Sequence, residues 1–213
     1  CSSDLFHNNQ GFAGGGAIAS GAGTLIANNC LFYNNSANDS GAAFFSQSAP
    51  ELAFTNCLFY GNQVSNYDGS AIYIADGAIT LDHCTVAGNN NRRALAILGA
   101  MGTVKNSIVW ANPWGGGGGS NVTSINCILQ ENATAGSGNI YTNPQFVNFN
   151  DPDGDDDIFG TADDGFVPGV CSPAIDGAAA PSPAFDLAGL DRVDAPVIGV
   201  SAADIGAYEQ QEA

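Results

Sequence analysis

The sequence predicts an all-β fold, a parallel β-helix (solenoid) of about five to six coils with a C-terminal segment that caps or flanks it. Three observations predict it: cysteines that recur every 27 residues, short strand-like segments between them, and a composition suited to turns. Gly alone numbers 28, while charged residues make up only 12% of the chain. Such a surface of Gly and small polar residues favours tight turns and short strands over helices.

The repeat is clearest around Cys30, Cys57 and Cys84, because the residues beside each cysteine also agree. Further copies begin at Asp4, Ser107 and Cys127. Equivalent residues of successive coils lie above one another, about 4.8 Å apart. The cysteines are therefore predicted to form an inward column of small buried thiols. The alternative, one disulfide among them, requires a closer approach than this stacking gives.

Two further columns follow from the same register. One is apolar, and stacked aromatic rings add to its stability. The other consists of Asn, which we expect at left-handed corners, with the side-chain amides hydrogen-bonded along the stack. The apolar column is Phe6, Phe32, Phe59, Val86, Val109 and Leu129, and the Asn column is Asn9, Asn35, Asn62, Asn89, Asn112 and Asn132.

Each period contains two more strand-like blocks. One recurs at 15–18, 41–44 and 69–72, and the other at 24–26, 52–54 and 78–81. Alternation over two or three residues without a stripe of period 3.6 excludes helical repeats. The position after each cysteine equivalent should point outward, and it forms an apolar stripe of Leu5, Leu31, Leu58, Thr85, Ile108 and Ile128. We expect the C-terminal segment to cover this stripe, and self-association is the alternative.

Two groups of motifs resemble known bacterial proteins. Gly-Gly-Ala-Ile at 15–18 and Phe-x-x-Asn at 6–9, 32–35 and 59–62 resemble the repeats of polymorphic outer membrane proteins and related right-handed β-helix surface proteins. This resemblance covers about the first eighty residues. The motifs at 172–177, 186–192 and 204–209 resemble the closing module of secreted bacterial β-helix proteins. Together they imply a right-handed helix and a secreted or cell-surface location in bacteria.

The composition changes near residue 138, which predicts coils over 1–137 and an acidic C-terminal cap over 138–213. Seven Asp residues lie between positions 151 and 164 and repel one another unless a cation neutralises them. Oxygen ligands around a Gly turn suit Ca²⁺. We predict a Ca²⁺ site made by Asp151, Asp153, Asp155 and Asp157, closed by Asp163 or Asp164. The spacing departs from an EF-hand, and the alternative is a solvated acidic loop.

The sequence assigns no catalytic residue. Lyase chemistry needs a base such as Arg or Lys, and the chain has only Arg92, Arg93, Lys105 and Arg192. We expect Arg92 and Arg93 to decorate a turn and Arg192 to pair with a nearby carboxylate. Asp82 and His83 should point to opposite faces if they share a strand. No Ser-His-Asp set is apparent, and the Gly run at 115–119 indicates a loop.

Charge and hydropathy limit the partners. The net charge is -17, which excludes nucleic acid as a partner. No run of eighteen apolar residues predicts a transmembrane helix. The chain begins inside a repeat, which suggests a fragment of a longer protein, and a lipoprotein terminus at Cys1 is the alternative.

These observations predict an extracellular structural or adhesive module that is stabilised by Ca²⁺ and assembles end to end into a fibre, or binds a cell-surface or glycan partner. End-to-end assembly would join strand edges, since the chain enters mid-coil and leaves an edge unpaired. The alternative is a domain that binds or degrades polysaccharide.

Overall fold

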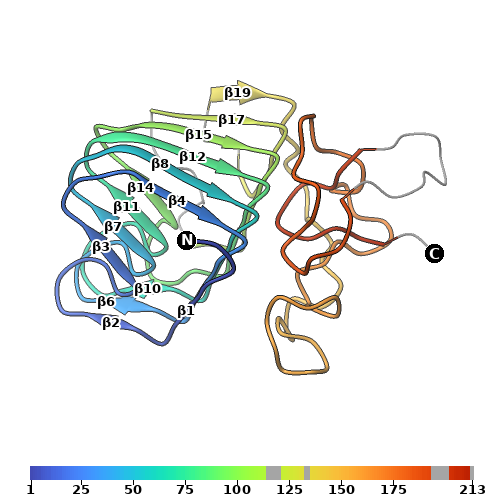
Figure 1. Ribbon diagram of the computed structural model, residues 1–213, viewed down its shortest axis with the longest axis horizontal. Helices are drawn as coiled ribbons and strands as arrows, with labels where there is room; N and C mark the ends of the chain where they lie inside the picture. The colour runs from blue at the N-terminus through green and yellow to red at the C-terminus, as the bar shows by residue number, and fades with distance from the viewer. Residues whose placement is uncertain (114–120, 132–134, 193–201, 212–213) are drawn as a thin grey trace.

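The computed structural model describes residues 1–113, 121–131, 135–192 and 202–211, and these contain strands but no helix. The chain winds into stacked coils whose strands form four parallel sheets (Figure 1), numbered here in the order in which a coil meets them. The predicted all-β solenoid is confirmed. Asn132 and the Gly run at 115–119 lie outside the described residues.

The strands of each sheet come from successive coils. The first sheet contains β1 (Leu5–His7), β5 (Leu31–Tyr33), β9 (Leu58–Tyr60), β13 (Thr85–Ala87), β16 (Ile108–Trp110) and β18 (Ile128–Leu129). The second contains β2 (Gln10–Gly11), β6 (Ser36–Ala37) and β10 (Gln63–Val64). The third contains β3 (Ile18–Ser20), β7 (Phe44–Ser46), β11 (Ile72–Ile74) and β14 (Leu95–Ile97). The fourth contains β4 (Leu25–Asn28), β8 (Ala49–Thr55), β12 (Gly77–Asp82), β15 (Met101–Lys105), β17 (Val122–Ile125) and β19 (Ala135–Ser137).

The register is the one that the repeat predicts. Phe6 pairs with Phe32, and Phe32 with Phe59, in parallel strands of the first sheet. Four coils contribute a strand to the first, third and fourth sheets, and the described residues of two later coils contribute strands to the first and fourth alone. Each residue of a strand therefore lies above the equivalent residue of the preceding coil.

The interior is formed by the predicted columns. The rings of Phe6, Phe32 and Phe59 are stacked with centroids 4.8 and 4.9 Å apart. Cys57 and Cys84 are fully buried, and all the cysteines of the described chain are free thiols. The Cys57 thiol donates to the carbonyl of Ala27, which belongs to the preceding coil. The column of buried thiols is confirmed.

The Asn column forms a hydrogen-bonded ladder from Asn9 to Asn112. Asn62 shows the pattern: its amide nitrogen donates to Asn89 Oδ1 at 2.9 Å and to the Phe32 carbonyl at 2.8 Å. The expectation of a left-handed backbone at these residues was wrong. Positive φ angles occur one residue earlier, at Asn8, Asn34, Gly61, Gly88 and Ala111. The ladder side chains point inward because this preceding residue turns the chain.

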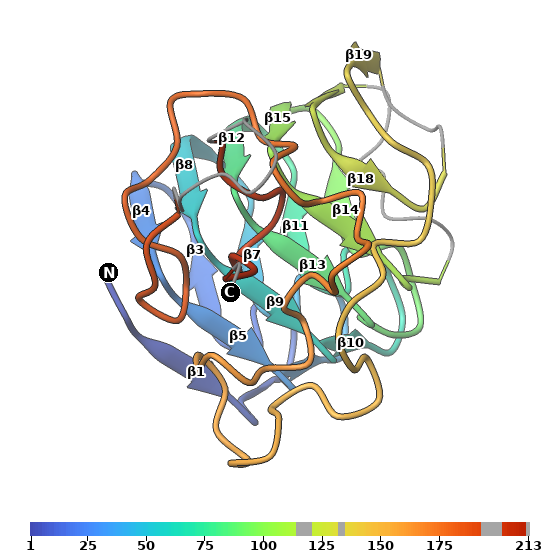
Figure 2. The ribbon, with the colours of Figure 1, turned by 90° about the vertical axis from the view of Figure 1, so that its right-hand side faces the viewer.

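The C-terminal segment lies along one side of the stack of coils (Figures 1 and 2). Its described residues form no strand after β19, which ends at Ser137. The segment packs on the outward face of the first sheet, with Phe166 and Tyr208 against Leu58 and Ala174 and Ile205 against Ile108 and Ile128. The predicted covering of the apolar stripe is confirmed, except at Leu5, which is 51% exposed.

Candidate functional site

A second row of corner residues holds the C-terminal segment on the solenoid. Asn56, His83 and Asn106 each precede a member of the cysteine column and have φ angles near 50°. This left-handed conformation points their side chains outward. Asn56 Nδ2 donates to the Phe185 carbonyl at 2.7 Å, and Asn106 Oδ1 accepts from the backbone of Ala179 at 2.9 Å. The corner therefore binds backbone groups of the C-terminal segment.

Asp82, His83 and Ser182 form a hydrogen-bonded row in this region. His83 Nδ1 lies 2.9 Å from Asp82 Oδ1, and His83 Nε2 lies 3.1 Å from Ser182 Oγ. The expectations that Asp82 and His83 diverge and that no Ser-His-Asp set exists were both wrong. β12 ends at Asp82, so His83 lies at a corner, where strand alternation does not apply. Ser182 comes from the C-terminal segment, 99 residues away in sequence.

The electrostatics of this row favour a neutral imidazole. Burial lowers the pKa of His83. Although burial opposes it, hydrogen bonds from His83 and Lys105 lower the pKa of the Asp82 carboxyl. The order of groups is that of a serine hydrolase triad. The row also connects the solenoid to the C-terminal segment, because His83 belongs to the first and Ser182 to the second.

Arg192 is the centre of a buried polar network, as its predicted pairing with a carboxylate requires. Its guanidinium lies 3.3 Å from Glu209 Oε2 and donates to Asn56 Oδ1 at 2.8 Å. Asp204 and Asp186 accept backbone hydrogen bonds from Gln210 and Glu209, at 2.8 and 2.9 Å. The motifs at 186–192 and 204–209 thus meet at Arg192, and the motif at 172–177 joins them through the Asp176 amide, which donates to Asp204 Oδ1 at 2.8 Å. Their role is to fold this segment and attach it to the solenoid.

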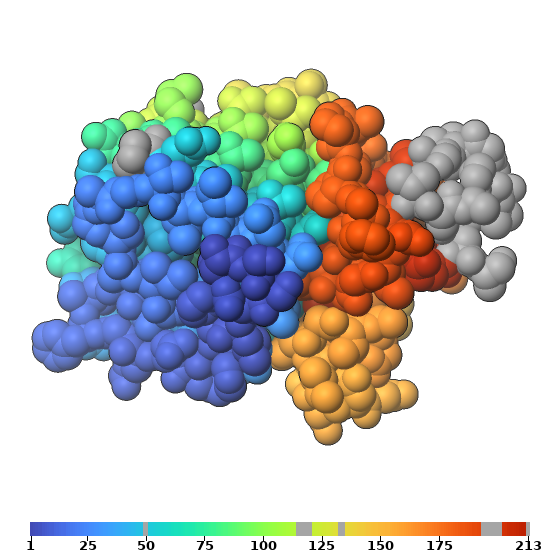
Figure 3. Space-filling view, in the orientation of Figure 1, coloured from blue at the N-terminus to red at the C-terminus, as the bar shows by residue number. Residues whose placement is uncertain are grey.

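The predicted calcium ligands lie in a loop that projects from the C-terminal segment, visible in light orange in Figure 3. The loop closes on itself, since the Gly165 amide donates to the Pro152 carbonyl at 3.2 Å. Gly154 is required at its turn, because its φ is +65° and an added Cβ would lie 2.4 Å from the Asp163 carbonyl. The structure thus brings both ends of the acidic run together.

The carboxylates of this loop point in different directions. Asp164 is buried and accepts hydrogen bonds from the Tyr208 hydroxyl and the Gly160 amide, whereas Asp163 is exposed and accepts from Thr161. Burial raises the pKa of Asp164 to about 6. Asp155 and Asp157 are exposed, and Asp151 and Asp153 are partly buried. Among the described residues, no three of these carboxylates have oxygens within 4.8 Å of one another.

A cleft of about 760 Å³ lies over the outward face of the third sheet. Its floor contains Phe45 of β7 and Tyr73 of β11, which pair in adjacent strands and stack with centroids 5.3 Å apart. Strand alternation explains this, because their neighbours Phe44 and Ile72 are buried in the core. Tyr67, which is 65% exposed, also lines the cleft.

Polar groups surround these rings. Arg93 Nε donates to Asp68 Oδ2 at 2.8 Å, and Arg92 donates to the Asn66 carbonyl at 3.2 Å. All four residues line the cleft and come from the turns that follow β10 and β13. The two arginines thus lie on turns, as expected, and they also line the cleft. Flat apolar rings with a few convergent polar groups are the usual lining of a ligand site.

The fold defines a protein of the parallel β-helix class. A family model described as "Right handed beta helix region" matches residues 2–109, which is more than half of the chain, and the chain belongs to this family. No curated protein and no solved structure matches it. Within the described residues, no helix is long and apolar enough to cross a membrane.

The sequence alone did not predict the cleft, because the residues that line it come from different coils. Phe45 and Tyr73 are 28 positions apart in the numbering. The available signal was the outward aromatic in equivalent blocks, directly after the buried Phe44 and Ile72. The Ser182 contact had no such signal, since the repeat does not extend into the C-terminal segment.

Proposed function

We propose that the protein is an extracellular adhesive β-helix module that binds polysaccharide in the cleft over the third sheet. The observation that carries this proposal is the stacked pair Phe45 and Tyr73, partly exposed on the floor of a cleft of about 760 Å³. Sugar rings have flat C–H faces that pack on aromatic rings and a rim of hydroxyls that hydrogen-bond. Asp68, Arg92 and Arg93 supply polar groups for these hydroxyls.

The charges favour a neutral glycan. The chain has a net charge of -17, which repels polyanions at long range. Within the cleft, Asp68 pairs with Arg93 and offsets its charge. A carbohydrate partner also suits the lateral position of the cleft, because an open groove on the side of a solenoid accepts an internal stretch of a long polymer.

The test is binding to a panel of neutral and acidic polysaccharides by affinity electrophoresis and titration calorimetry. Tyr67→Ala and Tyr73→Ala should each weaken binding of the preferred polymer about tenfold, which corresponds to about 1.4 kcal/mol of lost stacking. Phe12→Ala removes an aromatic ring that is 91% exposed outside the cleft and should leave binding unchanged. Binding that is lost equally in all three variants, or never detected, would refute the proposal.

A cleavage screen of the same polymers, with and without EDTA, separates binding from degradation. We expect no release of reducing ends or unsaturated products. Cleavage that disappears in Arg92→Ala would instead favour a lyase that uses a base in this cleft.

We also propose that Ca²⁺ binds in the acidic loop of residues 151–164. The support is the density of charge in a closed turn, where Asp163 faces the turn at Gly154. The carboxylate oxygens lie apart and must move toward one another to surround the ion, so binding should order the loop. Because the loop contacts Tyr33 and Tyr60 through Phe159, this ordering would be transmitted to the solenoid.

End-to-end association is a separate proposal for the same module. In the described chain, β1, β2 and β3 lie at the ends of their sheets, and each pairs with one strand only. Leu5 and Phe12 of this first coil are 51% and 91% exposed. Strand addition by another copy would pair this edge and bury these side chains. Electron microscopy of native material should show fibres, and uniformly monomeric particles at high concentration would exclude them.

A further inference from the structure

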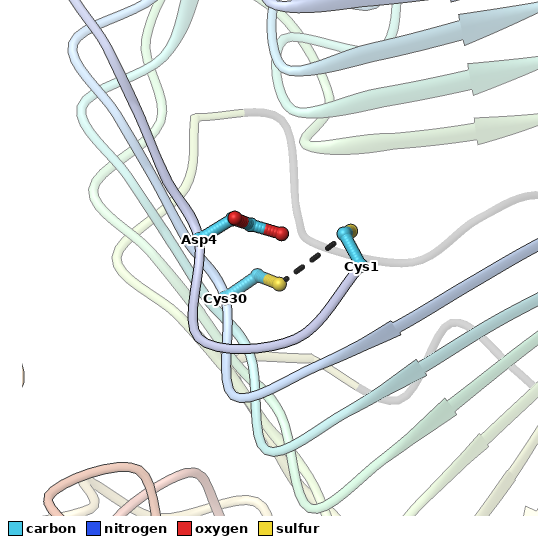
Figure 4. Close-up of side chains that lie close together, drawn as sticks. All are labelled: Cys1, Asp4 and Cys30. Atoms are coloured by element: carbon cyan, nitrogen blue, oxygen red, sulfur yellow. Dashed lines mark hydrogen bonds between the residues drawn. The ribbon is translucent and has the colours of Figure 1, made fainter.

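We propose that Cys1, Asp4 and Cys30 bind one thiophilic divalent cation, with Zn²⁺ as the expected ion. The three side chains meet at the start of the solenoid, on two adjacent coils (Figure 4). Each offers one ligand atom, and these atoms all lie within 4.8 Å of one another. No other group of three His, Cys, Asp or Glu residues meets this criterion in the described part of the chain.

The backbone fixes Cys1 and Asp4 opposite Cys30. The Cys1 carbonyl accepts from the Asn28 amide at 3.1 Å, and the Ser3 amide donates to the Asn28 carbonyl at 3.0 Å. Ser3 has a φ of 55°, which is the same left-handed corner that recurs in later coils. The Asp4 carbonyl then accepts from Leu31 at 3.0 Å. The ligands are therefore held by the sheet register and the corner.

The spacing of the sulfurs suits a tetrahedral ion. Cys30 Sγ lies 3.6 Å from Cys1 Sγ. Zn–S bonds of about 2.3 Å at the tetrahedral angle place two sulfurs about 3.8 Å apart. A disulfide needs about 2.05 Å, so it requires a larger movement of both side chains. The two sulfurs could therefore bind Zn²⁺ with almost no change in their separation.

Cys30 differs from the other members of its column. The thiols of Cys57, Cys84 and Cys127 each donate to a backbone carbonyl of the preceding coil. At Cys30 the Sγ of Cys1 takes that place. The site is thus the end of the column, where a second sulfur and a carboxylate replace a carbonyl.

The donor atoms and their exposure favour a soft ion that enters from solvent. Two sulfurs select Zn²⁺ or another soft ion over Ca²⁺ and Mg²⁺. Cys1 and Asp4 are exposed while Cys30 is buried, so an ion can enter from solvent and keep a water as its fourth ligand. The site is separate from the acidic loop and does not depend on the polysaccharide cleft.

The test is a Co²⁺ titration of the reduced protein, followed by competition with Zn²⁺ and with Ca²⁺. We expect thiolate-to-cobalt charge-transfer absorption that saturates at one ion per chain, is displaced by Zn²⁺ and is unaffected by Ca²⁺. Cys1→Ser should abolish this absorption, and Asp4→Asn should weaken Co²⁺ binding at least about tenfold. Cys171→Ser is the matched control, because Cys171 is also exposed and free.

Cys1 and Asp4 both lie before β1, so the metal-free Cys1→Ser and Asp4→Asn variants should melt at the temperature of the metal-free parent protein. Two results would overturn the proposal. One is charge-transfer absorption that is absent, or that is retained in Cys1→Ser. The other is recovery of Cys1 and Cys30 as a disulfide from protein isolated without reductant, since oxidised sulfurs cannot both ligate the ion.

Discussion

At the scale of single residues, the corner before each cysteine determines how the solenoid contacts its surroundings. A left-handed backbone suits Asn, whose short polar side chain tolerates a positive φ. Asn29, Asn56, Asn106 and Asn126 occupy this corner, and Ser3 and His83 are the exceptions. Because the conformation points the side chain outward, the same residue that turns the coil can also bind the C-terminal segment. His83 keeps this function through its contact with Ser182.

We expect Ser182 to be a structural residue. A fluorophosphonate probe should leave it unmodified, because two prolines flank it and His83 is fully buried behind it. Ser182→Ala should lower the free energy of unfolding by about 1 kcal/mol, the usual net value of one hydrogen bond. Mass spectrometry after labelling and urea denaturation check the two expectations. Covalent modification of Ser182 that disappears in His83→Asn would instead identify a nucleophile and its base.

The buried carboxyl of Asp164 predicts a pH dependence. Its pKa is raised from 3.8 to about 6, so the folded state binds the proton more tightly than the unfolded chain. Its contribution to stability is greatest below pH 4 and is lost as the pH rises through 6. In EDTA, the melting temperature of the parent protein relative to Asp164→Asn should be higher at pH 5 than at pH 7.5. His83 titrates in both proteins, so its effect cancels from this difference in melting temperature.

An unchanged difference between the two melting curves at pH 5 and pH 7.5 would show that Asp164 does not titrate in this range. The side-chain amide introduced by Asp164→Asn would keep an acceptor for the Tyr208 hydroxyl and the Gly160 amide, so the variant should fold.

At the scale of structural elements, the Asn ladder stabilises each coil against its neighbours. Asn62 Oδ1 accepts from both the backbone and the side chain of Asn35. Asn62→Ala would therefore leave the Phe32 carbonyl and the Asn35 amide groups buried without these partners. We expect a loss of about 2–4 kcal/mol in the free energy of unfolding, measured by urea denaturation.

Asn9→Ala provides the comparison, because Asn9 is the exposed end of the same ladder and its side chain donates to Asn35. Its cost should stay below about 1 kcal/mol. Equal costs at both positions would mean that the interior ladder does not contribute through hydrogen bonding.

The ladder also shows which elements a sequence can predict. Residues in one column see the same environment in every coil, so a repeat in the sequence predicts the register, the core columns and the outward stripe. The local backbone was harder: the left-handed residue precedes Asn35 rather than coinciding with it. The cleft depends on turns that differ between coils, and the Ser182 contact joins two regions with no shared period. Neither leaves a periodic pattern.

At the scale of the whole molecule, one side of the solenoid is covered and another carries the cleft in which we propose that glycan binds. The first sheet is covered by the C-terminal segment, which the buried cation of Arg192 holds to Asn56. The third sheet presents the aromatic cleft.

Calcium should stabilise this assembly through the C-terminal segment. Addition of EDTA to Ca²⁺-loaded, zinc-free protein should lower the melting temperature by several degrees, as expected when an ion bound only to the folded state is removed. Asp153→Asn combined with Asp163→Asn should lower it similarly and abolish the EDTA effect. Cys1→Ser should leave the calcium effect intact, because Cys1 lies outside the loop. Melting curves that EDTA does not shift would exclude the loop as a calcium site.

Glycan binding over the third sheet is best tested by a crystal structure of the protein with an oligosaccharide from the polymer that it binds most tightly. We expect sugar rings packed on Phe45 and Tyr73, with hydroxyls that reach Asp68 or Arg92. An oligosaccharide bound instead in the smaller cleft beside Trp110 and Phe146, or at the first coil, would contradict the proposed function.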